Sequence, residues 1–196
     1  MPQRIIDTHV HVWNFEKAEY AWLNGDTSIL NRNYHIEELE PERTKAGITE
    51  GVLVQAANNF EDTDWMLDVA KKNEWIKGVV GWLPLMNPSE TLWALKEKYS
   101  DQNYFKGVRH LIHDEADAKW LLQKQVIESL QIVSDYNLPY DVVGVLPEHI
   151  ETALELANKI PSLKMVFDHL NQPPIASHEN YGRWGELMKE ASGRKN

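Results

Sequence analysis

The stretch Arg4-Ile5-Ile6-Asp7-Thr8-His9-Val10-His11-Val12-Trp13 decides how the chain is interpreted, because it places two histidines at the end of an apolar run. Side chains alternate between the faces of a β-strand, so His9 and His11 are expected to point the same way, roughly 6.5–7 Å apart along the strand. Two imidazoles at that spacing can bind one cation or one anionic substrate. The competing interpretation is a polar strand end without function. The same alternation turns three apolar residues toward packing helices: Ile6, Val10 and Val12.

The composition indicates an acidic globular protein. The chain has 196 residues, of which 42% are hydrophobic and 26% charged, and its formal net charge is −10. It contains no basic cluster, so nucleic acid and anionic membranes are poor partners. It has no cysteine, which excludes disulfides and Cys-based metal sites and favours a cytoplasmic location. Neither a signal-peptide pattern nor an apolar run of membrane-spanning length is present.

Short apolar runs alternate with helical segments along the chain. Their dense Val, Ile and Leu content is typical of parallel strands covered by helices. The expected strands are residues 4–12, 49–56, 76–85, 105–112, 139–146 and 164–170. The expected helices are residues 35–46, 61–73, a segment that opens at 87–90, 119–135, a segment that starts at 147, and 178–191.

Six consecutive β-α units predict a parallel α/β architecture. The first turn, residues 11–16, contains no glycine, which argues against the phosphate-binding turn of a doubly wound nucleotide domain. We therefore predict a TIM-type (β/α) barrel, with residues 1–196 as a single barrel domain and the chemistry at the carboxyl ends of its strands. Such a barrel has eight strands. About six of its eight units are expected here, and strands seven and eight are lacking.

Polar residues cluster where the predicted strands end. The residues at these ends are His9, His11, Gln55, Arg109, His110, Asp168 and His169. Three of the histidines could coordinate one Zn²⁺ and leave a position open, and a cation held there polarises a carbonyl group. The three are His9, His11 and His169. Without a metal, the same histidines could hold an ester carbonyl as hydrogen-bond donors.

Alternation also assigns sides within two adjacent pairs. Asp168 and His169 have opposite parity, so we expect Asp168 to face away from the barrel interior and to orient a ligand from behind. Of Arg109 and His110, we favour Arg109 as the inward residue, because its planar fork binds oxyanions at two points. A surface ion pair is the alternative for Arg109. The other histidines in helical or loop segments are expected at the surface: His35, His149 and His178.

These residues resemble the amidohydrolase-2 branch of the amidohydrolase superfamily, especially its sugar-acid lactonases and pyrone-dicarboxylate lactonase. The matching segments are residues 6–13, 20–23, 51–56, 106–110, 114–115, 120–122, 138–141 and 168–174. The resemblance implies a (β/α)₈ barrel that hydrolyses a cyclic ester, with His9, His11 and His169 lining the site. Some relatives use a divalent metal there, and some lactonases do without one. Arg109 matches a substrate-positioning arginine, and Gln55 and His110 are further candidates for substrate binding.

The chain also departs from the family pattern. Relatives carry a catalytic Asp, the general base, in a Gly-Ser-Asp-Trp-Pro-like stretch near the end of strand eight, and a Lys-x-Ser-Gly-like strand seven. Neither is present in residues 1–196, and the family's Asp-His-Leu-Gly-Lys-Pro pattern reads Asn171-Gln172 here. We therefore expect the base to lie outside this chain, and we expect the chain alone to be inactive because that Asp is absent. Either the chain is a fragment completed by a C-terminal segment or second chain, or its gene encodes a degenerate barrel.

The sequence thus predicts a hydrolase that acts on a small molecule, with water opening the lactone of a sugar acid or of a small carboxylated ring. Two other functions stay open. One is a non-catalytic barrel that binds a sugar acid or a metal. The other is a metal-dependent decarboxylase, since the same branch of the superfamily contains such enzymes.

Overall fold

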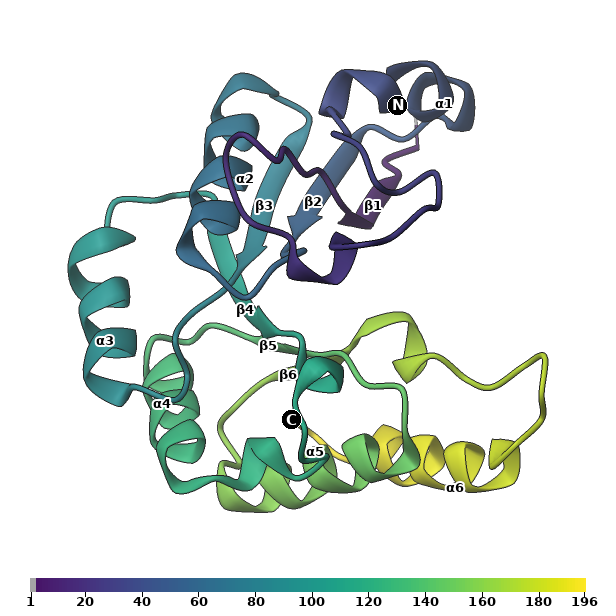
Figure 1. Cartoon of the computed structure of the whole chain (residues 1–196). Helices are drawn as coiled ribbons and strands as arrows, with labels where there is room; N and C mark the ends of the chain where they lie inside the picture. The colour runs from purple at the N-terminus through teal and green to yellow at the C-terminus, as the bar shows by residue number, and fades with distance from the viewer. Residues whose placement is uncertain (1–2) are drawn as a thin grey trace. The chain divides into compact units, whose positions relative to one another are not determined.

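The computed structural model describes residues 3–196 (Figure 1). Their strands form a six-stranded sheet in the order β1 to β6, and the strand pairs with a described register are parallel. The strands are β1 (Ile6–Val10), β2 (Glu50–Val54), β3 (Ile76–Gly81), β4 (Phe105–His110), β5 (Tyr140–Val142) and β6 (Met165–Phe167). Six parallel strands in chain order confirm the predicted α/β architecture, although every strand is shorter than its apolar run.

Helices follow the strands, as the alternation of apolar runs and helical segments predicted. They are α1 (Glu40–Ala46), α2 (Phe60–Lys72), α3 (Pro88–Trp93), α4 (Lys124–Asp135), α5 (Pro147–Lys159) and α6 (Tyr181–Ser192). Asn59 and Asn87 cap α2 and α3 by accepting a backbone hydrogen bond from the third residue of each helix, which satisfies one of the free donors there. The expected helix over 119–135 is interrupted, because Gln123 is extended (ψ 141°) between a 3₁₀ turn and α4.

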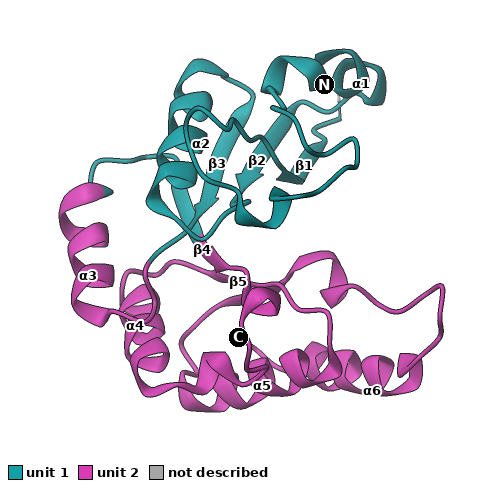
Figure 2. Ribbon diagram, viewed as in Figure 1, with its two compact units in different colours: residues 1–83, 99–107 teal, residues 84–98, 108–196 magenta. Residues whose placement is uncertain are grey.

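The chain divides into two compact units (Figure 2). Unit 1 holds the described residues up to 83 together with 99–107, and unit 2 holds residues 84–98 and 108–196. Strand β4 begins in unit 1 and ends in unit 2. The assignment of residues 1–196 to one barrel domain stays a prediction.

In unit 1, the long loop that follows β1 is fastened to the end of β2. An antiparallel bridge joins Trp13 to Tyr34 within the loop, and Trp13 belongs to a buried cluster that includes Ala56 and Ala57 just beyond β2. Asp62, fully buried in the first turn of α2, accepts hydrogen bonds from the Tyr20 hydroxyl and from the backbone N–H groups of Ala56 and Ala57. These contacts hold the carboxyl end of β2 in place.

In unit 2, the strand register assigns the two faces of the sheet. Phe167 packs against a cluster of residues from α5 and α6. Phe167 pairs with Val142, and Val142 pairs with His110, so these side chains face the helices. Arg109 and Asp141, which pair with each other one position earlier, therefore face the opposite side of the sheet. In a (β/α) barrel, the face away from the helices is the interior.

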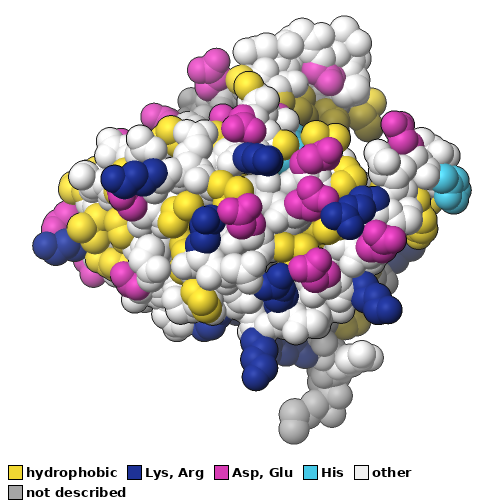
Figure 3. Space-filling model, turned by 90° about the horizontal axis from the view of Figure 1, so that it is seen from below, with side chains coloured by type: hydrophobic (Ala, Val, Ile, Leu, Met, Phe, Trp, Pro, Cys, Tyr) yellow, Lys and Arg dark blue, Asp and Glu magenta, His cyan; other side chains and the backbone are white. Residues whose placement is uncertain are grey.

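The outer surface on the side of α5 and α6 carries acidic and basic side chains in an interspersed pattern (Figure 3). Its exposed ion pairs include Lys159–Glu155 and Arg183–Glu151, and such pairs contribute little stability in water. Within residues 3–196, no helix combines the length and the apolar character that crossing a membrane requires.

Candidate active site

His9 and His11 meet at the end of β1. Their Nε2 atoms are 3.0 Å apart, so the expectation that both side chains lie on one side is confirmed. His11 Nδ1 lies 2.8 Å from the Val54 carbonyl oxygen. Because a carbonyl only accepts, Nδ1 carries the proton and Nε2 of a neutral His11 keeps its lone pair. Of the three apolar residues expected to face helices, Val10 and Val12 are buried, but Ile6 is 41% exposed.

The geometry of this histidine pair suits a divalent cation. Two nitrogens bound to tetrahedral Zn²⁺ at 2.0–2.1 Å lie about 3.3 Å from each other, close to the observed 3.0 Å between the Nε2 atoms. Metal-binding histidines also donate their other ring N–H to a carbonyl or carboxylate, as His11 does to Val54. Neither unit, within the described residues, gathers three His, Asp or Glu side chains that could hold a metal. The three-histidine ligand set therefore stays a prediction.

Gln55 lies directly after Val54 at the carboxyl end of β2 and is fully buried. Its Nε2 donates to Asn58 Oδ1 at 2.9 Å, whereas its Oε1 has no hydrogen-bond partner among residues 3–196. A buried acceptor without a partner costs about 1–3 kcal/mol. Its position beside the carbonyl that holds His11 indicates a place where a bound hydroxyl or water can donate a hydrogen bond.

In unit 2, Arg109 and Asp168 form a buried ion pair, with Nη1 3.0 Å from Oδ2. The expectation that Asp168 faces away from the interior is therefore wrong, because Asp168 lies on the same face of the sheet as Arg109. The prediction failed because it measured parity against His169. Asp168 continues the alternation of β6, whereas the backbone changes conformation at His169 (φ 36°).

Asp141 is a site residue that the sequence analysis did not single out. Burial raises the pKa of its carboxyl group to about 7, and the negative charge of Asp168 and a hydrogen bond with it act in the same direction. The positive charge of Arg109 opposes this shift in part. The strand register identifies Asp141 as a site residue, because Asp141 pairs with Arg109 in the neighbouring strand.

His110 occupies the other face of β4. Its ring stacks on Trp120, with centroids 4.1 Å apart and planes 14° apart, and its Nε2 lies 2.7 Å from Glu115 Oε1. These are contacts within the protein interior on the side of the helices. Substrate binding by His110 therefore stays a prediction.

Three other histidines of unit 2 differ in their surroundings. His149 is 2% exposed, so the prediction of a surface position is wrong for it. Its Nδ1 accepts hydrogen bonds from the backbone N–H groups of Val145 and Leu146, which fixes the turn into α5. Burial and the positive charges of Arg109 and His169 lower the pKa of His113. His169 itself is exposed, as are His35 and His178.

The predicted extension of the sixth strand to residue 170 is wrong, because β6 ends at Phe167. Residues 168–171 form a 3₁₀ turn, and His169, Leu170, Asn171 and Gln172 have φ angles between +36° and +56°. Left-handed backbone costs roughly 1–2 kcal/mol for each ordinary residue. Such a run persists only where the surrounding structure holds it, which is a frequent property of functional sites.

The parallel strands in chain order, with polar side chains at their carboxyl ends, define an α/β-barrel protein of the kind that carries chemistry at the strand ends. The chain belongs to the amidohydrolase family, amidohydrolase-2 branch, whose model (Amidohydrolase) matches residues 6–196. This confirms the resemblance that the sequence motifs indicated.

The chain is also similar to a curated enzyme and, in its fold, to solved structures. L-fucono-1,5-lactonase of Burkholderia ambifaria is 28% identical over 97% of this chain, and the chain spans 64% of its length. A crystal structure of an amidohydrolase from Burkholderia multivorans with bound Zn superposes with a TM-score of 0.85 at 24% identity, over 97% of this chain and 66% of that one. A probable 2-pyrone-4,6-dicarboxylic acid hydrolase from Acinetobacter baumannii gives a TM-score of 0.68 at 19% identity, over 94% of this chain and 66% of that one. The fold class is therefore a TIM-type (β/α) barrel, with six of its β-α units in the described residues.

Proposed function

We propose that the protein of which this chain is a part or the whole is a lactonase, in which water opens the cyclic ester of a sugar acid or of a small carboxylated ring. Membership of the amidohydrolase family and the similarity to L-fucono-1,5-lactonases support a hydrolase of this kind. The observation that carries the proposal is the pair His9–His11, with Nε2 atoms 3.0 Å apart and the His11 ring held by the Val54 carbonyl. It presents imidazole nitrogens at the carboxyl end of β1, where a barrel binds its substrate.

His9, His11 and His169 are the proposed metal ligands, with Zn²⁺ as the first candidate. The fit of the histidine pair to two ligand positions supports this, and an amidohydrolase of the same fold has been solved with bound Zn. When bound, a divalent cation would polarise the carbonyl of the ester. In the metal-free alternative, the same imidazoles donate hydrogen bonds to the carbonyl oxygen.

Gln55, Arg109 and His110 are the proposed substrate-positioning residues. Gln55 Oε1, buried without a partner among the described residues, can accept a hydrogen bond from a substrate hydroxyl. The charge of Arg109 is offset by Asp168 and lies close to Asp141. Its guanidinium carries N–H donors that can bind an oxygen of the substrate.

The attacking water must give up a proton. The Asp expected at strand eight lies outside residues 1–196, in a C-terminal segment or second chain. Asp141 is a further candidate acceptor, because a carboxyl group with a pKa of about 7 is close to the pH at which proton transfer is effective. A cytoplasmic location stays a prediction.

A ring-opening assay tests the proposal. Hydrolysis of a lactone releases an acid, so titration at constant pH follows turnover of a panel of sugar-acid and pyrone lactones, with and without added Zn²⁺. We expect turnover with at least one lactone, its loss in His11→Ala, and full activity in the control His35→Ala, which changes an exposed histidine.

The absence of turnover by the complete protein on the whole panel, with and without metal, would refute the lactonase. Release of carbon dioxide from an aromatic acid would indicate the decarboxylase instead. Saturable binding of a sugar acid without turnover would indicate a non-catalytic barrel.

A further inference from the structure

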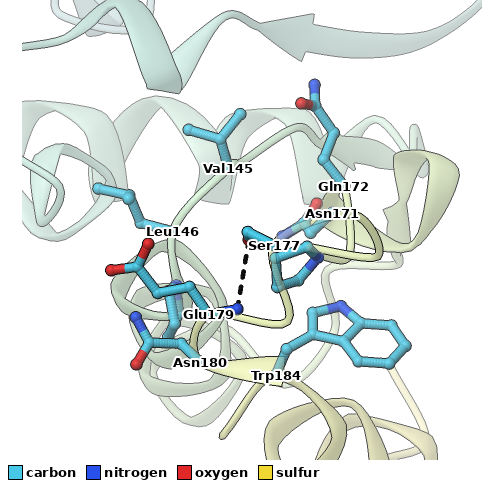
Figure 4. A pocket seen from close by; sticks show the side chains of 10 residues that line it. Val145, Leu146, Asn171, Gln172, Ser177, Glu179, Asn180 and Trp184 are labelled. Carbon is cyan, nitrogen blue, oxygen red and sulfur yellow. Dashed lines mark hydrogen bonds between the residues drawn. The ribbon is translucent and has the colours of Figure 1, made fainter. Parts of the chain in front are cut away.

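A pocket of about 200 Å³ lies within unit 2, at the carboxyl ends of β5 and β6 (Figure 4). Its walls come from the loop that follows β5, the first residue of α5, the segment that follows β6 and the beginning of α6. The carboxyl ends of barrel strands are the usual place for small-molecule binding. None of the residues to which the proposed function assigns a role lines this pocket.

One side of the pocket carries polar side-chain groups that have no hydrogen-bond partner within the described residues. The Glu179 carboxylate and the Asn180 amide lie next to each other (Figure 4) and make no hydrogen bond or ion pair within residues 3–196. Ser177 Oγ accepts from the Glu179 backbone N–H at 3.2 Å, so its own hydroxyl proton remains available for donation. The wall thus supplies both acceptors and donors.

Asn171 adds a donor to the wall of the pocket. It is 2% exposed, and its Oδ1 accepts from the Gly144 backbone N–H at 3.3 Å. Its Nδ2 is buried and has no partner within the described part of the chain. An amide held on one side and unsatisfied on the other costs about 1–3 kcal/mol, a cost that a bound acceptor would remove.

Apart from the Gln172 side chain, the remaining walls are apolar, and they carry no positive charge. Leu146 is 47% exposed, and the Trp184 indole is fixed because its Nε1 donates to the Leu170 carbonyl at 2.8 Å. The ten residues that line the pocket include no Lys or Arg. With the carboxylate of Glu179 as the single charged group among them, the pocket disfavours an anionic ligand.

The backbone of the segment after β6 is strained around these groups. Asn171 and Asn180 both have positive φ angles, 52° and 55°, a conformation that Asn tolerates better than most residues. Leu170 (φ 56°) has no such tolerance. The amides of the pocket are therefore held on a backbone that is costly to maintain, and such strain concentrates at binding sites.

We propose that this pocket binds an uncharged, polyhydroxylated molecule with the size of one sugar ring. Glu179 and Asn180 accept hydrogen bonds from its hydroxyls, Asn171 and Ser177 donate hydrogen bonds to its oxygens, and the apolar walls cover its carbon face. The volume equals that of about seven water molecules, which leaves room for one ring. The proposal extends the proposed function and rests on it at one point, the identity of the ligand. A neutral sugar lactone fits this description, and the carboxylate that forms when its ring opens does not.

Saturation-transfer NMR on the full chain tests the proposal with a neutral monosaccharide and with the uronate anion of the same sugar. We expect the neutral sugar to bind and the anion to bind at least about tenfold more weakly, a difference of about 1.4 kcal/mol. Glu179→Gln should reduce that preference to less than about threefold, and Asn180→Ala should weaken sugar binding. Glu186→Gln is the matched control, because it changes an exposed carboxylate on α6 that does not line the pocket.

Failure of the neutral sugar to bind, stronger binding of the anion, or equal effects of Glu179→Gln and Glu186→Gln would each overturn the proposal. Circular dichroism of each variant shows whether it is folded. Asn180→Asp is a second variant at the same exposed position, and it keeps the side-chain oxygen that accepts the hydrogen bond. The measurement does not depend on turnover, so it detects sugar binding even by a chain without lactonase activity. Conversely, turnover without the charge preference refutes this pocket and leaves the lactonase intact.

Discussion

Arg109 and Asp168 have side chains only 6% and 3% exposed, so the loss of one partner leaves an unpaired charge in the interior. We expect Arg109→Met to lower the free energy of unfolding by about 3–5 kcal/mol, measured by urea denaturation. Arg183→Met is the control, because Arg183 pairs with Glu151 at the surface and its loss should cost less than about 1 kcal/mol. Equal losses in the two variants would contradict the burial of the Arg109 pair.

The raised pKa of Asp141 predicts how stability depends on pH. The folded state holds a proton up to pH of about 7, whereas an unfolded Asp releases it near pH 4. Between these values the folded state binds more protons, so this group lowers stability as pH rises from about 4 to 7. Asp141→Asn should flatten that decline and stabilise the protein at pH 8 by roughly 1–3 kcal/mol.

Urea midpoints of the wild type and Asp141→Asn, compared at pH 5, 6, 7 and 8, check this prediction. Parallel curves would show that Asp141 does not titrate in this range. Asp135→Asn, which changes a carboxylate at the end of α4 that accepts only a surface hydrogen bond from Gln131, is the control and should leave the pH dependence unchanged.

Single residues were predictable where a regular strand fixes the direction of the side chain. His9 and His11 lie together as the alternation required. Asp168 was predicted wrongly because its parity was measured against His169, where the backbone leaves the strand conformation. His149 was predicted wrongly because its burial follows from the hydrogen bonds that its ring accepts at the start of α5. Asp141 was missed because its environment comes from two other strands.

At the scale of elements, Asp62 connects α2 to the end of β2. It accepts hydrogen bonds from the Tyr20 hydroxyl at 2.9 Å and from the Ala56 and Ala57 N–H groups at 2.8 and 3.1 Å. Asp62→Ala leaves these donors unsatisfied in the interior, so we expect it to cost about 3–5 kcal/mol. Tyr20→Phe removes one of the bonds and should cost about 1 kcal/mol.

Thermal and urea denaturation of the two variants measure the difference. A Tyr20→Phe variant as unstable as Asp62→Ala would show that the hydroxyl, and not the backbone contacts of Asp62, holds the loop. The N–H groups of Ala56 and Ala57 should also exchange faster with deuterium in Asp62→Ala, because they lose their acceptor.

Element types were predictable, and element ends were less so. The side-chain caps at Asn59 and Asn87 are local interactions at the starts of α2 and α3. Strand ends did not follow the apolar runs, because the runs continue past Phe167 and Val142 into loop backbone. The apolar residues there include Leu170, Val145 and Leu146, which are exposed, so apolar composition alone does not locate the end of a strand.

At the scale of the whole molecule, the histidine pair predicts a response to metal. A ligand at about 100 times its dissociation constant stabilises the folded state by about 2.7 kcal/mol, which corresponds to roughly 5–10 °C in Tm for a chain of this length. We expect Zn²⁺ to raise the Tm of the wild type by such an amount, and to raise that of His9→Ala or His11→Ala much less. His178→Ala, at an exposed position, should respond as the wild type does.

An equal response of all four proteins would place the metal elsewhere. A wild type that Zn²⁺, Mn²⁺ and Co²⁺ all fail to stabilise would favour the metal-free alternative, in which the imidazoles bind the carbonyl directly.

The sequence by itself determined the class of fold and the position of the histidine pair. Alternation along β1 and the repetition of β-α units are local patterns, set by residues close in the chain, and they predict parallel strands with chemistry at their ends. The family motifs lie at those same ends, so the family was also readable from the sequence.

Only the tertiary structure decided which carboxylates surround Arg109 and where the polar pocket of unit 2 lies. The Arg109–Asp168 pair joins residues 59 positions apart, and the pocket depends on left-handed backbone at Asn171 and Asn180. Side-chain direction after a turn follows from dihedral angles that long-range contacts impose, and no local periodicity encodes them.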